Sequence, residues 1–253
     1  MPSRMAVVLA AGKGTRMSSE LPKVLHPVCA RPMIHFVLDA VEQCDVEQTV
    51  VVVGHQAEAV KKELAGRKQV EFAMQHDQHG TGHAVQMCRP YLDHHDGAVL
   101  IVTGDSPLIQ VDSISALMEM YDQVAPACIL GTAHKQDPTG LGRVERDKNG
   151  HFAAIIEEKE ASEAQRQLTE VNMSTYLFDC GRLCYALDRI SNDNRKGEYY
   201  ITDCPGILKL AGDDVRALNV LKPCETLSIN TNAELALVDA EMREMGYGDE
   251  AGT

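Results

Sequence analysis

A glycine-rich loop that directly follows a short apolar run gives the clearest indication of the fold: Leu9-Ala10-Ala11-Gly12-Lys13-Gly14-Thr15-Arg16-Met17, then Leu21-Pro22-Lys23. Residues 6–9 form the apolar run and are predicted to be a buried strand. Small residues allow the loop backbone to approach a ligand closely. Backbone amides of such a loop, at the carboxyl end of a parallel strand, can bind phosphate oxygens. The loop therefore predicts a phosphate-binding site at the end of the first strand.

Three cations accompany this loop. Lys13, Arg16 and Lys23 lie within eleven residues of an otherwise acidic chain. The P-loop pattern has no match, and the dinucleotide-binding fingerprint would need a third glycine where Met17 stands. A Gly-x-Gly pair alone also fits a tight turn, so the phosphate interpretation depends on Arg16 and Lys23. Lys13 fits an ordinary surface charge equally well.

Outward from the loop, short apolar runs alternate with amphipathic stretches. Expected strands are residues 6–9, 49–53, 70–74 and 98–103, and expected helices are residues 33–43, 57–64, 82–89 and 112–123. Asp112 or Ser113 is the expected N-cap of the last of these helices. Continuous apolar strands that alternate with helices favour a mostly parallel central sheet with helices on both faces, an α/β fold.

The pattern changes after residue 127. Residues 128–134, 142–146 and 152–156 are strand-like with no helices between them, which predicts a smaller β-rich subregion over about 140–178. Residues 183–190, 201–211 and 232–245 are expected to be helical, and residues 246–253 to be a polar tail. The chain has no internal repeat and no linker.

Composition excludes several classes of protein. The 253 residues include 24 basic and 37 acidic side chains, a net charge of −13, with no basic cluster of the kind that nucleic-acid binding requires. No apolar run approaches the length of a membrane span, and residues 5–11 lack the cleavage site of a signal peptide. The eight cysteines are scattered without a Cys-x-x-Cys pair, which favours buried reduced thiols. We therefore expect a cytoplasmic protein with no nucleic-acid or membrane partner.

These motifs resemble those of the sugar-nucleotide pyrophosphorylases, a family of Rossmann-like nucleotidyltransferases. Within that family, four later stretches are similar to the N-terminal uridylyltransferase domain of the bifunctional enzymes that make UDP-N-acetylglucosamine, a cell-envelope precursor. They are Gln75-His76-Asp77-Gln78-His79-Gly80-Thr81-Gly82-His83-Ala84, Gly104-Asp105-Ser106-Pro107-Leu108, Asp137-Pro138-Thr139-Gly140-Leu141-Gly142-Arg143 and Gly197-Glu198-Tyr199-Tyr200-Ile201-Thr202-Asp203. The resemblance covers about residues 5–245.

The resemblance implies a Mg²⁺-dependent transfer from UTP to N-acetylglucosamine 1-phosphate with release of pyrophosphate. It implies one domain over 1–253, with a nucleotide-binding half at about 5–135, a sugar-binding half at about 136–230 and a C-terminal helix at 232–245. A monomer or weak homo-oligomer is expected, because the element that trimerises the relatives has no counterpart. The hexapeptide repeats of the acetyltransferase region are also missing after Asn230, so no acetyltransferase activity is expected.

The same resemblance assigns site residues by role. The catalytic cations are Arg16 and Lys23. The nucleotide-binding residues are Leu9, Ala10, Ala11, Gly12, Gly14, Gln75, Gln78, Gly80, Thr81 and Gly104. The sugar-binding residues are Gly140, Glu157, Asn172, Tyr200 and Thr202. The metal ligands are Asp105 and Asn230. Asn232 stays open as an alternative metal ligand and also as a helix N-cap, and Glu158 as an alternative to Glu157.

Some features depart from the family pattern. Met173-Ser174 follows Asn172 where the family usually has Thr-Gly, and Thr103 stands where it often has Tyr. His76, His79 and His83 suggest a metal-binding helix face, but the glycines at 80 and 82 are expected to break a helix there. Two alternatives stay open: a nucleotidyltransferase for another sugar 1-phosphate, such as glucose 1-phosphate with UTP or dTTP, and an inactive subunit that senses sugar nucleotides.

Overall fold

The computed structural model describes residues 3–17 and 19–248. Its strands are β1 (Ser3–Leu9), β2 (Pro27–Val28), β3 (Arg31–Pro32), β4 (Gln48–Val53), β5 (Val70–Met74), β6 (Gly97–Thr103), β7 (Cys128–His134), β8 (Gly142–Arg146), β9 (Phe152–Ile156), β10 (Glu170–Asp179) and β11 (Val215–Asn219). Its α-helices are α1 (Met33–Glu42), α2 (Ala57–Glu63), α3 (Thr81–Gln86), α4 (Arg89–Leu92), α5 (Val111–Val124), α6 (Glu163–Arg166), α7 (Cys180–Leu187), α8 (Asp203–Leu210) and α9 (Asn232–Glu244). Three 3₁₀ turns are η1 (Thr15–Met17), η2 (Lys23–Leu25) and η3 (Pro223–Thr226).

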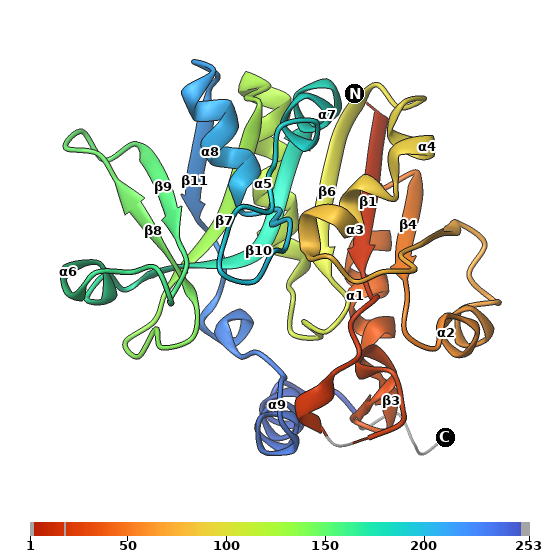
Figure 1. The fold of residues 1–253 in the computed structure, drawn as a ribbon. Coiled ribbons are helices and arrows are strands. Elements are labelled where there is room, and N and C mark those ends of the chain that lie inside the picture. The colour runs from red at the N-terminus through yellow and green to blue at the C-terminus, as the bar shows by residue number, and fades with distance from the viewer. Residues whose placement is uncertain (1–2, 18, 249–253) are drawn as a thin grey trace.

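The described residues form one large sheet in the order β11-β7-β10-β6-β1-β4-β5. β6, β1, β4 and β5 are parallel neighbours, and β7 and β11 are a second parallel pair. β10 lies antiparallel between β6 and β7, and it also pairs with β8, which continues into β9. The β8–β9 hairpin projects from the side of the sheet (Figure 1). The prediction of a mostly parallel central sheet with a smaller β-rich subregion is confirmed.

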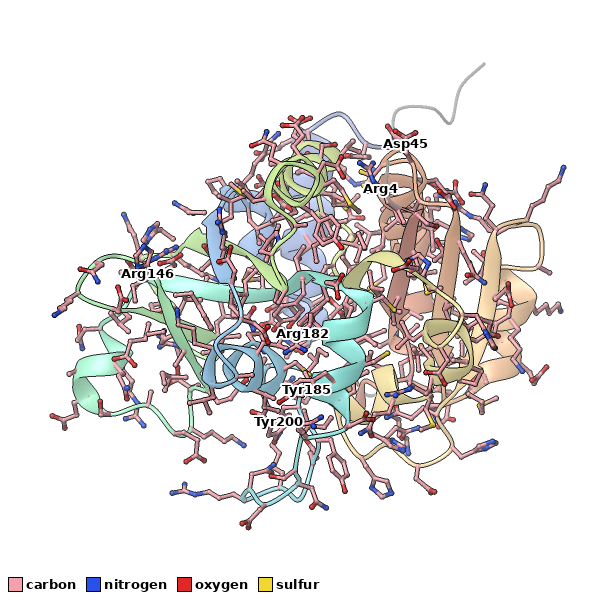
Figure 2. All side chains as sticks on the ribbon, turned by 90° about the horizontal axis from the view of Figure 1, so that it is seen from above. Arg4, Asp45, Arg146, Arg182, Tyr185 and Tyr200 are labelled. Atoms are coloured by element: carbon pink, nitrogen blue, oxygen red, sulfur yellow. The ribbon has the colours of Figure 1, made fainter. Side chains whose placement is uncertain are left out.

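Helices cover both faces of the sheet because the strands are apolar on both faces. Successive residues of β1 point to opposite sides, so Met5 and Val7 pack with α3, α4, α7 and α8, while Ala6 and Val8 pack with α1, α2 and α5. Figure 2 shows side chains filling both sides, with Arg182 and Tyr185 of α7 on one of them. Each fully buried Val or Leu contributes about 1.5–3 kcal/mol, so the continuous apolar strands stabilise this layered arrangement.

Two helix caps differ from the prediction. Neither Asp112 nor Ser113 caps α5, because α5 begins one residue earlier and its N-cap is Gln110. The backbone amide of Gln110 and the hydroxyl of Ser113 instead donate to the buried carboxylate of Glu225, at 3.1 and 2.5 Å. The N-cap of α9 is Thr231 rather than Asn232, and its hydroxyl accepts from the backbone amide three residues on at 3.2 Å. A backbone amide at the start of each helix thus has a side-chain acceptor, which is distant in the sequence for α5 and local for α9.

Other differences concern short or polar elements. The hairpin of β2 and β3, the short α6 and the edge strand β11 have no counterpart in the prediction. The expected helix over 201–211 begins at Asp203, and the one over 82–89 divides into α3 and α4. Of the expected polar tail, residues 246–248 form a turn, and residues 249–253 lie outside the described residues.

Most of the cysteines are buried, in agreement with the prediction of buried thiols. The eight cysteines all lie within the described residues, where none of them forms a disulfide, and six of them are buried. Burial raises the pKa of the Cys88 thiol to about 12, which suppresses formation of the reactive thiolate. Within residues 3–17 and 19–248, no helix is both long and apolar enough to cross a membrane.

Candidate active site

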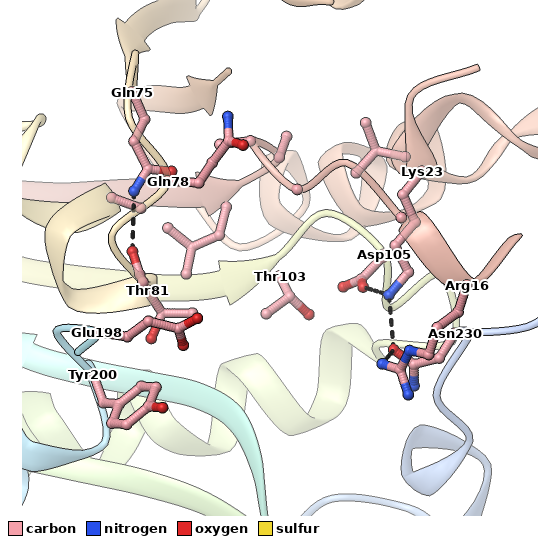
Figure 3. Close-up of a pocket in the computed structure, with 18 residues that line it drawn as sticks. Arg16, Lys23, Gln75, Gln78, Thr81, Thr103, Asp105, Glu198, Tyr200 and Asn230 are labelled. Atoms are coloured by element: carbon pink, nitrogen blue, oxygen red, sulfur yellow. Dashed lines mark hydrogen bonds and ion pairs between the residues drawn. The ribbon is translucent and has the colours of Figure 1, made fainter. Parts of the chain in front are cut away.

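A cavity of about 390 Å³ opens at the carboxyl ends of β1 and β6 and beside β5 (Figure 3). In open α/β sheets this is the edge where ligands bind, and the volume suits a small molecule. The residues that line it are Leu9, Ala10, Ala11, Gly12, Gly14, Arg16, Lys23, Val24, Gln75, Gln78, Gly80, Thr81, Ala84, Thr103, Asp105, Glu198, Tyr200 and Asn230. Segments far apart in the sequence therefore meet around one cavity.

The glycine-rich loop forms one wall of the cavity. The backbone amide of Ala10 donates to the carbonyl of Val52 at 2.9 Å, and that of Gly104 donates to Leu9 at 2.9 Å. Gly14 has a φ of +64°, and a Cβ there would lie 2.9 Å from Cβ of Lys23. A side chain at this position would therefore push Lys23 away from the cavity. Gly104 itself is not among the lining residues, but it joins Thr103 and Asp105, which are.

Cations and oxygen acceptors gather at one end of the cavity. The Lys23 ammonium donates to Oδ2 of Asp105 and, at 3.2 Å, to Oδ1 of Asn230. The Arg16 guanidinium donates to the same Asn230 oxygen at 2.8 Å. Arg16 is exposed, whereas Lys23 and Asp105 are partly buried. This end of the cavity thus combines two positive groups with a carboxylate and an amide oxygen, which suits a polyphosphate and its counter-ion.

The donor set at this end fits Mg²⁺. Oxygens of Asp105 and Asn230 already converge on one cationic group, the Lys23 ammonium. Magnesium binds carboxylate and amide oxygens and usually completes its shell with phosphate oxygens and water. Among the described residues, no three His, Cys, Asp or Glu side chains form a metal-binding group, so a bound Mg²⁺ would rely on this two-residue pair.

The structure separates the two candidate asparagines. Asn230 lines the cavity, and its backbone amide donates to Oε2 of Glu234 at 2.8 Å. Asn232 does not line the cavity, and its side chain instead donates to the carbonyl of Met17 at 3.5 Å. Of the two, Asn230 is the one placed beside Lys23 and Asp105.

Amide and glycine residues form the opposite end of the cavity. Gln75 is only 3% exposed, and its Nε2 donates to the carbonyl of Gly80 at 3.0 Å. Gly80 is the N-cap of α3, with φ 103° and ψ 177°. A Cβ there would lie 2.4 Å from the carbonyl oxygen of Tyr199. Only glycine fits this position, because both the backbone conformation and the space exclude a side chain.

Three hydrogen bonds join this end to the segment that carries Tyr200. The Tyr199 amide donates to the His79 carbonyl at 2.7 Å, and the Gly82 amide donates to the Tyr199 carbonyl at 2.8 Å. The Ile201 amide donates to the hydroxyl of Thr81 at 3.1 Å. These bonds place Glu198 and Tyr200 on the cavity wall. Partial burial, followed by the neighbouring carboxylate of Glu198, raises the pKa of the Tyr200 phenol to about 12, so the phenol stays protonated at neutral pH.

The other four predicted sugar-binding residues lie outside the cavity lining. Asn172 is 6% exposed and donates to the hydroxyl of Tyr176 at 2.7 Å. The hydroxyl of Thr202 is buried and has no hydrogen-bond partner in the described part of the chain. Glu157 is half-buried, and its charge contributes to the raised pKa of Tyr176 and of Tyr200. Asn172 therefore contacts Tyr176, and Glu157 lies close enough to affect both Tyr176 and Tyr200.

Gly140 and Glu158 have structural partners. Oε2 of Glu158 accepts the backbone amide of Gly140 at 3.3 Å and pairs with the guanidinium of the buried Arg143 at 2.8 Å. The Glu158 carboxylate therefore already has two partners. The Glu157 carboxylate has no side-chain hydrogen bond within the described residues. The glycine opposite Asn172 in the β8–β10 register is Gly142 rather than Gly140.

Several cavity residues were not predicted. Val24, Ala84, Thr103 and Glu198 line the cavity, and a Cβ on Gly54 would lie 2.9 Å from Nε2 of Gln78. Ala84 and Glu198 lie within quoted motifs, and Val24 and Thr103 lie directly beside them, which is the signal that could have found these four residues. Lys13 is exposed and is not a lining residue, in agreement with the surface-charge alternative.

The predicted histidine arrangement is divided by Gly80. α3 starts at Thr81, so His76 and His79 precede the helix and only His83 lies within it. The rings of His79 and His83 are 5.1 Å apart between centroids. The expected helix break is confirmed at Gly80, whereas Gly82 lies within α3.

Comparisons with known proteins agree with this geometry. The family model of the MobA-like NTP transferase domain matches residues 6–190. "Bifunctional protein GlmU" of Geobacillus thermodenitrificans is 43% identical over 96% of this chain and 53% of its own length, and that of Bacillus subtilis is 42% identical over the same shares. The chain thus spans about half the length of these curated relatives.

A solved structure shows the same fold. It belongs to a Bacillus anthracis protein described as a glucose-1-phosphate thymidylyltransferase in complex with a sucrose, and it covers 96% of both chains with a TM-score of 0.78 at 20% identity. The match to the family model, the similarity to the GlmU proteins and the shared fold together show that this chain belongs to the MobA-like NTP transferase domain family of nucleotidyltransferases.

Proposed function

We propose that the chain is a Mg²⁺-dependent uridylyltransferase that joins UTP to N-acetylglucosamine 1-phosphate and releases pyrophosphate. One observation carries the proposal: a single cavity has Arg16, Lys23, Asp105 and Asn230 at one end and a buried glutamine amide with a glycine at the other. The first end suits a triphosphate, and the second suits a pyrimidine base, because a glutamine amide offers both a donor and an acceptor. The similarity to the GlmU proteins supports the choice of substrates.

In the proposed reaction, a phosphate oxygen of the sugar 1-phosphate attacks the α-phosphorus of UTP, and the bond from that phosphorus to the bridging oxygen of pyrophosphate breaks. The protein mainly has to position the reactants and stabilise charge. Arg16 would bind the β and γ phosphates, and Lys23 would stabilise the charge that develops around the reacting phosphate. Mg²⁺, held by Asp105 and Asn230, would neutralise phosphate charge and orient the oxygens.

Both cations are restrained before substrate arrives, by Asn230 and, for Lys23, by Asp105 as well. A side chain that is already held near its working position has less rotamer freedom to lose when substrate binds. Gly14 adds to this restraint, since its missing side chain allows the loop to pack against Lys23.

We also propose that the sugar binds next to Tyr200, among Glu157, Asn172 and Thr202. The unpartnered hydroxyl of Thr202 supports this placement, because buried polar groups normally find a partner. Gly142 faces Asn172 across the β8–β10 pair, so we assign close approach of the sugar to Gly142 in place of Gly140. We propose that the chain forms one domain, in which residues of about 5–135 bind the nucleotide and residues of about 136–230 bind the sugar.

The test is pyrophosphate release by the purified chain with Mg²⁺ across a substrate panel. The panel pairs UTP, CTP and dTTP with the 1-phosphates of N-acetylglucosamine, glucose, glucosamine and N-acetylgalactosamine. The proposal predicts the highest kcat/KM for UTP with N-acetylglucosamine 1-phosphate. Preference for another sugar would overturn the substrate assignment and keep the cavity as the reaction site. Absence of turnover with every pair would refute the enzymatic proposal.

A further inference from the structure

The amide of Gln75 is held in one orientation by two partners. Its Nε2 donates to the carbonyl of Gly80 at 3.0 Å and lies 3.0 Å from Nδ1 of His83. A backbone carbonyl can only accept, so the NH₂ group of the amide has to face Gly80. Both amide hydrogens are then used within the protein. Oε1 is left without a partner in the described part of the chain, on a residue that lines the cavity (Figure 3).

His83 can accept from Gln75 only in one neutral tautomer, with Nδ1 unprotonated and the proton on Nε2. Burial, and then the neighbouring His79, lowers the pKa of His83, while a hydrogen bond to the backbone of Asp77 acts in the opposite direction. Since Nδ1 faces the Gln75 amide, Nε2–H is the group available to Asp77.

We propose that His83 is a positioning residue that fixes the Gln75 amide so that its Oε1 faces the base and accepts N3–H of uracil. This inference rests on the proposed function and adds a source of base specificity to it. Uracil carries a hydrogen on N3, whereas N3 of cytosine is an acceptor and would be repelled by Oε1. Thymine shares the N3–H, so this contact separates UTP and dTTP from CTP but does not separate UTP from dTTP.

Gly80 alone holds the amide less firmly than Gly80 and His83 together. With one N–H bond the amide can tilt about its terminal torsion, which is broad for glutamine, and Oε1 then leaves the line of the base. A site that is built to bond one hydrogen rejects a base that lacks it, provided that the acceptor is fixed in place. The expected loss when His83 no longer accepts is therefore a loss of discrimination between bases rather than a loss of chemistry.

The test compares kcat and KM for UTP and CTP in the wild type and in His83→Leu, His83→Asn and His79→Leu. Asparagine can place an acceptor oxygen near the position of Nδ1, whereas leucine cannot. His79 lies beside His83 but has no hydrogen bond to Gln75, so His79→Leu is the matched control. The inference predicts that His83→Leu lowers the ratio of kcat/KM for UTP to that for CTP about ten-fold, mainly through KM. His83→Asn should restore most of that ratio, and His79→Leu should leave it unchanged.

An unchanged UTP to CTP ratio in His83→Leu would overturn the inference, and so would failure of His83→Asn to exceed His83→Leu. If His83→Leu does not fold, His83→Ala takes its place in the same comparison. Dissociation constants for UTP and CTP, measured by calorimetry without sugar, give the same ratio independently of turnover. A wild type that prefers CTP would overturn the proposed function together with the inference, whereas a wild type that prefers UTP leaves the variants to decide the inference alone.

Discussion

Gly80→Ala is expected to destabilise the chain and to weaken nucleotide binding, because Gly80 occupies a backbone conformation that only glycine adopts readily. Its φ of 103° and ψ of 177° lie in a region that costs other residues about 1–3 kcal/mol. The new Cβ would stand 2.4 Å from the Tyr199 carbonyl oxygen and 3.0 Å from the Tyr199 amide nitrogen. The two loops would have to move apart.

Separation of these loops breaks the hydrogen bonds from Tyr199 to His79 and from Gly82 to Tyr199, which contribute about 0.5–1.5 kcal/mol each. The sum of strain and lost bonds is a destabilisation of about 2–6 kcal/mol. For a chain of this length that lowers Tm by roughly 10 °C. KM for UTP should also rise, since the Gly80 carbonyl holds the Gln75 amide.

Thermal and urea unfolding of Gly80→Ala measures this destabilisation, with Gly206→Ala as the control. Gly206 lies inside α8, and a Cβ there meets nothing within 4 Å. Alanine should therefore stabilise the control by about 0.5–1 kcal/mol through helix propensity. A Gly80→Ala variant within 1 kcal/mol of the wild type, with an unchanged KM for UTP, would refute the close-packing argument.

Three further predictions follow from the described contacts. Arg16→Ala should lower kcat/KM about 100- to 1,000-fold and change the unfolding free energy by less than about 1 kcal/mol, since Arg16 is exposed. Lys13→Ala in the same assay is the control. An unaltered rate for Arg16→Ala would show that Arg16 is an ordinary surface charge. Ser174 has a φ of 57°, so Ser174→Gly should stabilise by about 0.5–1 kcal/mol in urea unfolding, and a loss of stability would contradict the strain assigned to Ser174. Burial alone would raise the pKa of Glu170, but hydrogen bonds from Arg146 and Thr132 outweigh it and lower the pKa. The Glu170 carboxylate therefore stabilises the fold at pH values above its unfolded-state pKa near 4.5, and this contribution is lost as the pH falls below that value. The stability advantage of the wild type over Glu170→Gln should thus shrink between pH 6 and pH 3.

The sequence predicted the regular part of the fold well because central strands such as β4, β6 and β7 are buried on both faces. Residues 70–74, 128–134, 142–146 and 152–156 coincide with β5, β7, β8 and β9. Continuous apolar or β-branched runs between glycines leave few other interpretations. The edge strand β11 was missed, since pairing with β7, which is distant in the sequence, stabilises it rather than a local pattern. β2 and β3 were missed because two residues each are too few to show a pattern.

Helix ends were harder to predict than helix interiors. Ser113 looks like an N-cap in the sequence, yet its hydroxyl donates to Glu225, more than one hundred residues away along the chain. Local pattern alone cannot identify such a partner. By contrast, the cap of α9 could have been read as Thr231 followed three residues later by Glu234, which is a capping-box spacing.

The end of the cavity that we propose for the nucleotide could be predicted from motifs, because each of these motifs ends a strand at the same edge of the sheet. The sugar end did not follow as directly. The motif predicted Gly140, and only the register of β8 with β10 places Gly142 opposite Asn172. The bulge after Asn172 likewise explains why the family usually has glycine at position 174, since Ser174 adopts there the left-handed conformation that glycine favours.

The most direct test of the central claim is pyrophosphate release by Asp105→Ala and by the wild type as Mg²⁺ is raised, with UTP and N-acetylglucosamine 1-phosphate as substrates. Asp77→Ala, which removes an exposed carboxylate that is not a cavity-lining residue, serves as the control, and thermal unfolding checks that each variant is folded. The account predicts that the wild type and Asp77→Ala turn over in a Mg²⁺-dependent manner, while folded Asp105→Ala loses at least about 100-fold in kcat at every Mg²⁺ concentration. Near-wild-type turnover by Asp105→Ala at low Mg²⁺ would contradict the account, because the reaction would then not depend on the carboxylate that faces Lys23 in this cavity.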